Sequence, residues 1–212
     1  MSKILALDTS TDACSVALSL NGEIREDFRV IPRQHTQQLL PMVEQLLAEA
    51  SLKVADLDAI AFGRGPGSFA GIRIATGVTQ GLAYAADLPV LPISTLDALA
   101  LAAYELEGAN QVVAALDARM DEVYIASYQV RDGIVSADMT EQVCSPAEIV
   151  LLEGDYLAVG SGWRYFDDMS SEVQERVQVS KETYYPAASA ILKLGMQAWE
   201  KGMAVEAAKA LP

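Results

Sequence analysis

Hydrophobic residues in the first half of the chain form short apolar runs that alternate with stretches of helical periodicity. Near-continuous apolar runs are typical of strands covered on both faces, and Asn21-Gly22 between two such runs is typical of a tight hairpin. Apolar positions spaced by three and four residues indicate helices. The predicted order is strands at Ile4–Leu7, Cys14–Leu20 and Ile24–Val30, a helix around Leu39–Ala50 with Pro41 in its first turn or at a kink, a strand at Leu57–Phe62, a helix at Ala70–Ala86, a strand at Pro89–Leu91 and a helix from Ser94 to Gly108.

The second half of the chain repeats this order of elements. Asp132-Gly133 predicts another tight hairpin, and Ser145-Pro146 followed by Glu148 predicts the start of a helix. The predicted strands are Gln111–Leu116, Val123–Val130, Ile134–Met139, Tyr156–Val159 and Val177–Val179; the predicted helices are Trp163–Ser170, after a loop at Gly160-Ser161-Gly162, and Ala188–Lys201, closed by Gly202.

The repeated order β-β-β-α-β-α-β-α predicts an α/β protein built by duplication. A match between Ile4–Asp8 and Val113–Asp117 supports this interpretation, and the alternative is that two unrelated α/β halves look alike at this level of detail. We expect two lobes, residues 1–110 and 111–212, with the C-terminal helix packing back on the first. Such a duplicated unit is typical of the two-lobe actin-like ATPase (ribonuclease H-like) fold.

Composition and charge narrow the range of functions. Of the 212 residues 51% are apolar and 21% charged, as in proteins that fold on their own, and the net charge is −14 with acidic residues spread over both halves. With no Lys/Arg cluster, such a chain repels phosphate backbones, so we expect no unaided binding of nucleic acid. Met1-Ser2-Lys3 leads directly into a predicted strand, and no apolar run reaches the roughly 20 residues of a membrane helix. We therefore expect a cytoplasmic protein without membrane contact.

Residues for metal or nucleophilic chemistry are scarce. His35 is the only histidine, and Cys14 and Cys144 are the only cysteines, which makes a Ser-His-Asp triad, a zinc site or a disulfide framework a poor interpretation. We expect no metal site and no catalytic residue, and we expect both cysteines to be buried small apolar residues.

The superfamily plan places Asp8 and Asp117 at the two phosphate-facing hairpins of a cleft. Neither turn contains the glycine that lets a backbone approach phosphate closely, and the second carries two extra carboxylates, so phosphate binding there is expected to be poor. Asp117 and Arg119 either line the cleft and touch a ligand or form an ion pair between the lobes. The candidate cleft residues are Asp8, Arg64, Gly65, Gly67, Asp117 and Arg119.

A glycine-rich loop, residues 63–71, opens a helix of unusual composition. The loop lacks the lysine of a P-loop, so it is only a weak phosphate-binding signal. From Ile74 to Ala86 the helix has no charged residue, and Gly77, Gly81 and Ala85 lie one turn apart on one face. Glycines inside a helix are tolerated where another element approaches closely. Either that element is the protein's own sheet, or the helix contacts another chain.

Four sequence segments resemble the bacterial TsaB (YeaZ) family, over nearly the whole chain. They are residues 4–18, His35–Pro41, Gly65–Arg73 and Asp117–Tyr124, of which the last two are highly specific. Ala70 replaces the family's usual threonine, which argues against a ligand contact by this side chain. The family's chain normally continues past the equivalent of Leu211-Pro212, so we expect any contribution of such a tail to binding to be missing here.

The resemblance implies a non-catalytic scaffold that binds and activates TsaD, together with TsaE, for transfer of a threonylcarbamoyl group to the tRNA adenosine beside the anticodon. It implies a homodimer when the chain is alone, contact with tRNA only through the complex, and ATP or ADP only in the complex. The first two helices of the first lobe would form the partner surface, with His35 in a packing or hydrogen-bonding role. Carried over by residue, that surface is His35, Leu39, Leu40, Val43, Leu47, Ile74, Gly77, Val78, Gly81 and Ala85.

Two other functions compete with the scaffold. A small-molecule kinase or ATPase of the actin-like superfamily would require the isolated chain to bind ATP. A peptidase would require a nucleophile with its base or a set of metal ligands, for which the sequence offers no good candidates.

Overall fold

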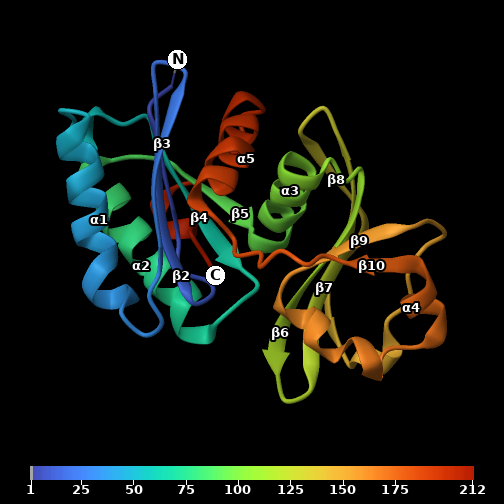
Figure 1. Ribbon diagram of the computed structural model, residues 1–212. Helices are drawn as coiled ribbons and strands as arrows, with labels where there is room; N and C mark the ends of the chain where they lie inside the picture. The colour runs from blue at the N-terminus through green and yellow to red at the C-terminus, as the bar shows by residue number, and fades with distance from the viewer. Residues whose placement is uncertain (1) are drawn as a thin grey trace. The chain divides into compact units, whose positions relative to one another are not determined.

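The computed structural model describes residues 2–212, which form two compact units (Figure 1). The first unit combines the chain up to Thr95 with residues 186–212. Its sheet has the order β3-β2-β1-β4-β5, with β1 antiparallel to β2 and parallel to β4. The strands are β1 (Ile4–Asp8), β2 (Ala13–Leu20), β3 (Glu23–Val30), β4 (Ala59–Gly65) and β5 (Val90–Ser94).

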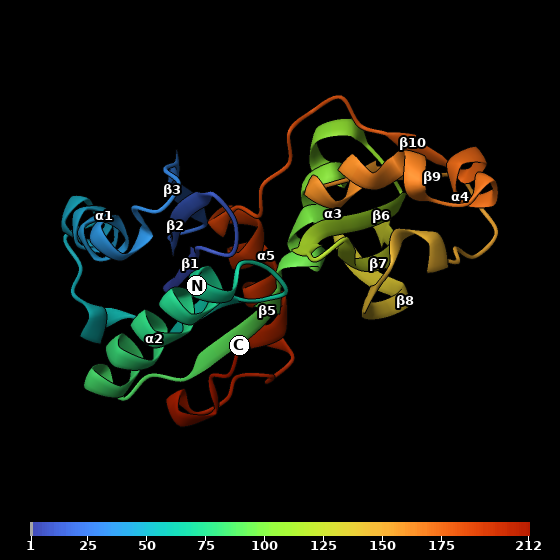
Figure 2. The same ribbon diagram turned by 90° about the horizontal axis from the view of Figure 1, so that it is seen from below.

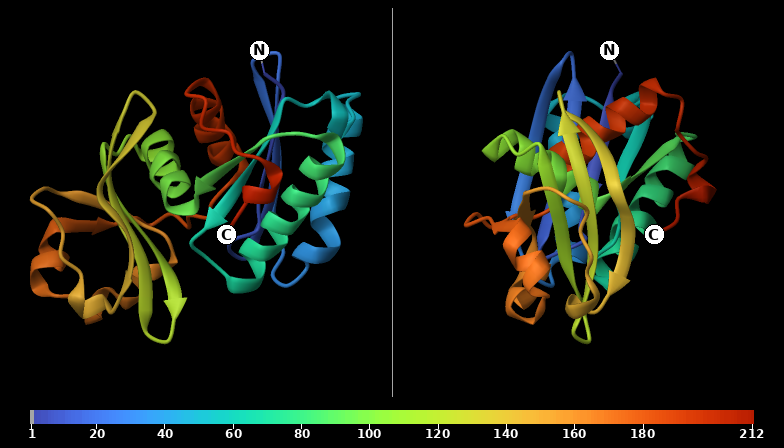
Figure 3. Two further views of the ribbon diagram at one scale, coloured as in Figure 1. Left: turned by 180° about the vertical axis from the view of Figure 1, so that it is seen from behind. Right: turned by 90° about the vertical axis from the view of Figure 1, so that its right-hand side faces the viewer.

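Helices cover both faces of this sheet. On one face α1 (His35–Glu49) and α2 (Phe69–Ala86) lie side by side, and Leu5 and Leu7 of β1 pack into a core with Leu39 and Met42 of α1 (Figure 3, left). The other face carries α5 (Ala188–Glu200), where Gly195 lies against Ala61. Because β1 is buried on both sides, it reads in the sequence as a continuous apolar run.

The second unit, Leu96–Tyr185, has a sheet of the same plan. Its order is β10-β9-β6-β7-β8, with β6 antiparallel to β7 and parallel to β9, as β1 is to β2 and β4. The predicted duplication and the two-lobe actin-like ATPase fold are thus confirmed. The strands are β6 (Gln111–Arg119), β7 (Glu122–Arg131), β8 (Ile134–Cys144), β9 (Tyr156–Val159) and β10 (Val177–Val179).

Two apolar clusters hold this second sheet. The helix α3 (Thr95–Glu107) packs Leu99 and Ala103 against β6 and β7 (Figure 2). Trp163, in the 3-10 segment η3 (Ser161–Asp168), and Val173, in α4 (Ser171–Arg176), belong to the other cluster. Single 3-10 turns complete the chain as η1 (Val54–Asp56), η2 (Pro146–Glu148) and η4 (Ala207–Lys209). Within residues 2–212, no helix combines the length and the apolar composition that a membrane crossing requires.

Three details differ from the sequence prediction. Pro41 lies in the second turn of α1 instead of the first. The predicted helix at Ser145 is only the single turn η2, because the backbone is extended again at Ile149, which is buried in the core. The first compact unit ends at Thr95 and not at residue 110, because the apolar face of α3 packs on the second sheet.

Candidate functional site

The glycine-rich loop closes tightly on the β1–β2 loop of the first unit. A Cβ at Gly67 would lie 2.5 Å from the carbonyl oxygen of Ser10, and one at Gly71 would lie 1.9 Å from that of Thr9. The amide of Ser68 donates a hydrogen bond to the Ser10 carbonyl (2.7 Å), and the Thr9 hydroxyl donates one to the Gly71 carbonyl (2.7 Å). These contacts explain both glycines by close backbone approach.

Asp8 lies at the end of β1, fully buried beneath this loop. Its Oδ1 accepts hydrogen bonds from the amide (2.9 Å) and the hydroxyl (2.8 Å) of Ser10, while its Oδ2 has no partner. A Cβ at Gly63 would lie 1.9 Å from that Oδ2. Burial, opposed by the bonds from Ser10, raises the pKa of Asp8 from 3.8 to about 6. Of the other candidates here, Gly65 is buried at φ +105° and Arg64 is half-buried.

The outward face of α2 is exposed and apolar. A Cβ at Gly77 or at Gly81 would meet no atom within 4 Å, so neither glycine serves the packing of the chain itself. Tyr84 (85% exposed) and Phe69 (74% exposed) lie on the same helix. We call the exposed residues Ala70, Gly77, Gly81, Tyr84 and Ala85 the α2 face.

The other predicted interface residues differ in exposure. On α1 only Leu40 is exposed, at 42%. Ile74 and Val78 are half-buried between α2 and the core. His35, Leu39, Val43 and Leu47 are buried within the first unit, where His35 Nε2 donates to the Ala13 carbonyl (3.2 Å).

The C-terminal segment flanks α2 on the side away from α1. Val205 and Val90 exchange two backbone hydrogen bonds (2.8 and 2.9 Å), which places the segment at the edge of β5. The Gln80 side chain donates to the carbonyl of the buried Ala210 (2.7 Å). The α2 face thus lies between α1 and residues 203–210 (Figure 3, left).

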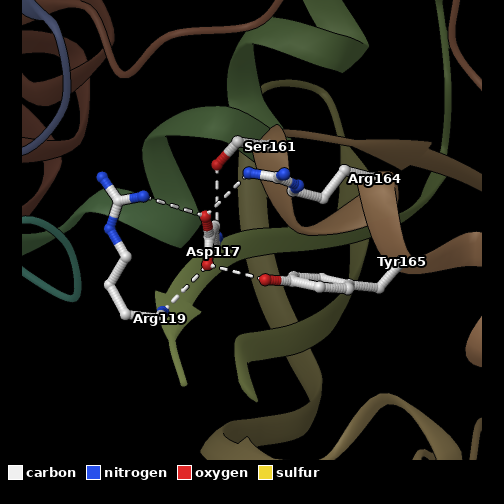
Figure 4. A network of polar contacts seen from close by, with 5 residues as sticks. All are labelled: Asp117, Arg119, Ser161, Arg164 and Tyr165. Carbon is white, nitrogen blue, oxygen red and sulfur yellow. Dashed lines mark hydrogen bonds and ion pairs between the residues drawn. The ribbon is translucent and has the colours of Figure 1, made fainter. Parts of the chain in front are cut away.

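In the second unit, Asp117 is the centre of a polar network (Figure 4). Its Oδ1 accepts from the backbone amide of Arg119 (2.9 Å) and from the Tyr165 hydroxyl (3.4 Å), and its Oδ2 accepts from the guanidinium groups of Arg119 and Arg164 (both 3.4 Å). Its own amide donates to Ser161 Oγ (3.2 Å). The Asp117 side chain is 11% exposed, whereas those of Arg119 and Arg164 are 83% and 63% exposed.

Comparisons with known proteins agree on one family. The curated TsaB protein of Escherichia coli (strain K12), described as a tRNA threonylcarbamoyladenosine biosynthesis protein, is 44% identical over 99% of this chain and 93% of its own length. The chain belongs to the TsaB (YeaZ) family. The TsaB of Haemophilus influenzae is 47% identical over 80% of this chain and 76% of its own length.

The structural comparison agrees with this family. YeaZ from Pseudomonas aeruginosa superposes with a TM-score of 0.95 at 47% identity, covering 100% of this chain and 99% of its own. The family model described as "TsaD: tRNA N6-adenosine threonylcarbamoyltransferase" matches residues 29–210. The resemblance on which the sequence interpretation rested is therefore confirmed.

Sequence reasoning within the TsaB family missed part of the Asp117 network. Arg164 and Tyr165 lie 47 and 48 residues from Asp117 and meet it because β9 pairs with β6 and η3 follows directly. Burial, with the carboxylates of Asp117 and Asp121 nearby, raises the pKa of Tyr165, so its hydroxyl stays a donor at neutral pH. The contact pairs Asp117 with Arg119 and Arg164 inside one unit.

Cysteine and metal chemistry complete the description of the site. Cys14 is buried with its Sγ 3.6 Å from Met42 Sδ, and burial raises the pKa of its thiol to about 12, which confirms it as an apolar core residue. Cys144 is only half-buried. Among residues 2–212, no three His, Cys, Asp or Glu side chains converge in the way that a metal ion requires.

Proposed function

We propose that this chain is the non-catalytic scaffold subunit of a cytoplasmic complex that makes threonylcarbamoyladenosine in tRNA, and that it binds and activates TsaD, with TsaE, through the α2 face. Its curated relatives are named for that biosynthesis. The observation that carries the proposal is the open space over Gly77 and Gly81.

The α2 face suits a close contact between helices. Each interior glycine costs a helix about 0.5–1 kcal/mol relative to alanine. No contact inside the chain compensates for Gly77 and Gly81, because a Cβ at either position meets nothing. An approaching partner helix would use the space, and Tyr84 and the half-buried Ile74 would supply apolar contact area. The buried residues Leu39, Val43 and Leu47 would then support the surface from beneath.

A scaffold role also agrees with the state of the glycine-rich loop. The carbonyl of Ser10 accepts from the amide of Ser68, which caps the start of α2, and the Asp8 carboxyl is closed off from solvent. A ligand phosphate would have to displace the β1–β2 loop to reach either group. We therefore infer that ATP or ADP enters only at a site formed with TsaD or TsaE.

The test of the partner surface is a pair of size variants. Gly77→Leu and Gly81→Leu should abolish the one-to-one complex with TsaD from the same organism, measured by size-exclusion chromatography with light scattering. The fold should be unaffected, because neither side chain meets an atom of its own chain at Cβ. Glu175→Leu, which places a leucine at an exposed position of α4, is the control and should assemble normally. Normal assembly of both glycine variants would refute the α2 face as the contact.

The same instrument tests the isolated chain. We expect a homodimer that converts to the one-to-one complex on addition of TsaD, since one apolar face would serve both contacts. Calorimetry with millimolar ATP and magnesium, and a filter-binding assay with tRNA, should both show no binding to the isolated chain. Heat of ATP binding would instead favour the kinase or ATPase interpretation.

A further inference from the structure

Three hairpins of this protein have the same two-residue loop but different residues in it. Leu20 pairs with Glu23, Arg131 with Ile134, and Arg119 with Glu122. In each loop both residues have positive φ, at Asn21-Gly22 (54° and 88°), Asp132-Gly133 (52° and 74°) and Met120-Asp121 (56° and 59°). Asn-Gly and Asp-Gly are the residues such a turn favours. The β6–β7 hairpin lacks glycine, and Arg119 before it is also at φ 70°.

The β6–β7 loop therefore pays an energetic cost that its own packing does not return. A positive φ is unfavourable for a side chain such as methionine, since Cβ crowds the following carbonyl oxygen. Met120 is 91% exposed, the highest value among the large apolar side chains of residues 2–212 that lie on the surface. A locally unfavourable residue with no compensating contact in its own chain is typical of a functional position.

The base of the hairpin is fixed while its tip projects into solvent. The buried carboxylate of Asp117 bonds the backbone amide of Arg119 and both guanidinium groups, and Tyr165 adds a further bond (Figure 4). Each guanidinium reaches Asp117 with one nitrogen and is otherwise exposed. The network thus holds two arginines beside the Met120 loop, so a partner would meet a surface that is already ordered.

The chemistry of this tip fits a protein better than a phosphate. The acidic Asp121 and Glu122 lie next to the two arginines, and Asp117 offsets part of their charge, so no net positive site remains. Methionine, arginine and tyrosine are enriched in protein interfaces, where methionine adapts to apolar pockets and arginine pairs with carboxylates.

We propose that the β6–β7 tip, with Met120 as its anchor and Arg119 and Arg164 beside it, docks into an apolar pocket bordered by carboxylates on a protein of the same assembly. This contact is separate from the α2 face in the first unit. It rests on the proposed function, because it supposes that the chain works within a TsaD–TsaE complex.

The test replaces the strained loop with the sequence of its unstrained counterpart. In Met120→Asn/Asp121→Gly the loop reads as Asn21-Gly22 does in the β2–β3 hairpin. The variant should gain stability, with a Tm rise of about 2–4 °C, and should bind TsaD or the TsaD–TsaE mixture at least about tenfold more weakly. Arg164→Glu should weaken binding in the same mixture. Leu106→Asn, which removes another exposed apolar side chain of the second unit, should change neither property.

Binding of the Met120→Asn/Asp121→Gly variant with unchanged affinity to both TsaD and the mixture would overturn the inference. So would a change confined to self-association of the chain. The α2 variants separate this result from the proposed function. If Gly77→Leu blocks assembly and the hairpin variant does not, only the hairpin contact fails; if neither changes binding, the scaffold proposal fails with it.

Discussion

At the scale of single residues, Asp8 is the group whose ionisation the fold opposes. Its carboxyl is fully buried, and one oxygen has no hydrogen-bond partner. Because its folded pKa of about 6 lies above the unfolded value of 3.8, folding favours the protonated form. The stability contributed by that form is complete below about pH 4. It is lost as the pH rises toward 6, because the unfolded chain ionises first.

Asp8→Asn should therefore remove a pH-dependent penalty. Relative to the variant, the wild type should lose about 3 kcal/mol of unfolding free energy between pH 4 and pH 7, as a pKa change of about two units implies. Urea unfolding of both proteins at several pH values measures this difference, since other groups titrate alike in the two. A difference that stays constant with pH would show that Asp8 is ionised in the folded state.

The burial of particular side chains is where the sequence carried least information. The periodicity of α1 predicted that Leu39, Val43 and Leu47 share a face, and the structure places all three in one core. The pattern does not distinguish a face that packs on the protein's own sheet from one that packs on a partner. For Asp8, the end of a strand was evident, but its burial depends on a loop more than fifty residues away.

At the scale of elements, α2 contains glycines of two kinds. Gly71 touches the Thr9 carbonyl, whereas Gly77 faces open space. Gly71→Ala should lower the unfolding free energy by about 1–3 kcal/mol through overpacking. Gly77→Ala should raise it by about 0.5–1 kcal/mol, because alanine favours the helix and meets no neighbour. Denaturant unfolding of the two variants side by side checks the contrast; destabilisation by both would mean that the outer face is also packed.

The elements themselves were largely predictable, because strand periodicity and turn residues are local signals. β9 and β10 lie at the predicted residues, and the Asn21-Gly22 and Asp132-Gly133 hairpins occur as predicted. The Ser145 start signal gave only one helical turn, since Ile149 and Leu151 after it are buried in the second core in extended or irregular backbone. The β6–β7 hairpin has no glycine signal, and only its register with β7 reveals a two-residue loop.

At the scale of the whole molecule, the two units differ in how the chain forms them. The second unit is continuous, residues 96–185, while the first needs both ends of the chain. We expect the fragment 96–185 to unfold cooperatively and the fragment 1–95 to remain unfolded, because without α5 one face of its sheet is bare. Circular dichroism during thermal unfolding of both fragments tests this. A stable 1–95 fragment would show that α5 is dispensable for the first core.

The duplication could be predicted from the order of elements, but the pairing of helices with sheets could not. Helix α3 follows β5 in sequence yet packs on β6 and β7, and α5 follows β10 yet packs on β1 and β4. Apolar faces on both helices were visible in the sequence. Nothing in a helical pattern specifies which of two equally apolar sheets the helix covers.

The split origin of the first unit has a consequence for its synthesis on the ribosome. The strands β1 to β5 emerge first, but α5 is translated only after residue 187, so one face of the earliest sheet has no cover until translation is nearly finished. The later-made segment, residues 96–185, has all its partners sooner. The nascent chain is thus expected to complete its second-made unit first, and the N-terminal strands must avoid aggregation in the meantime.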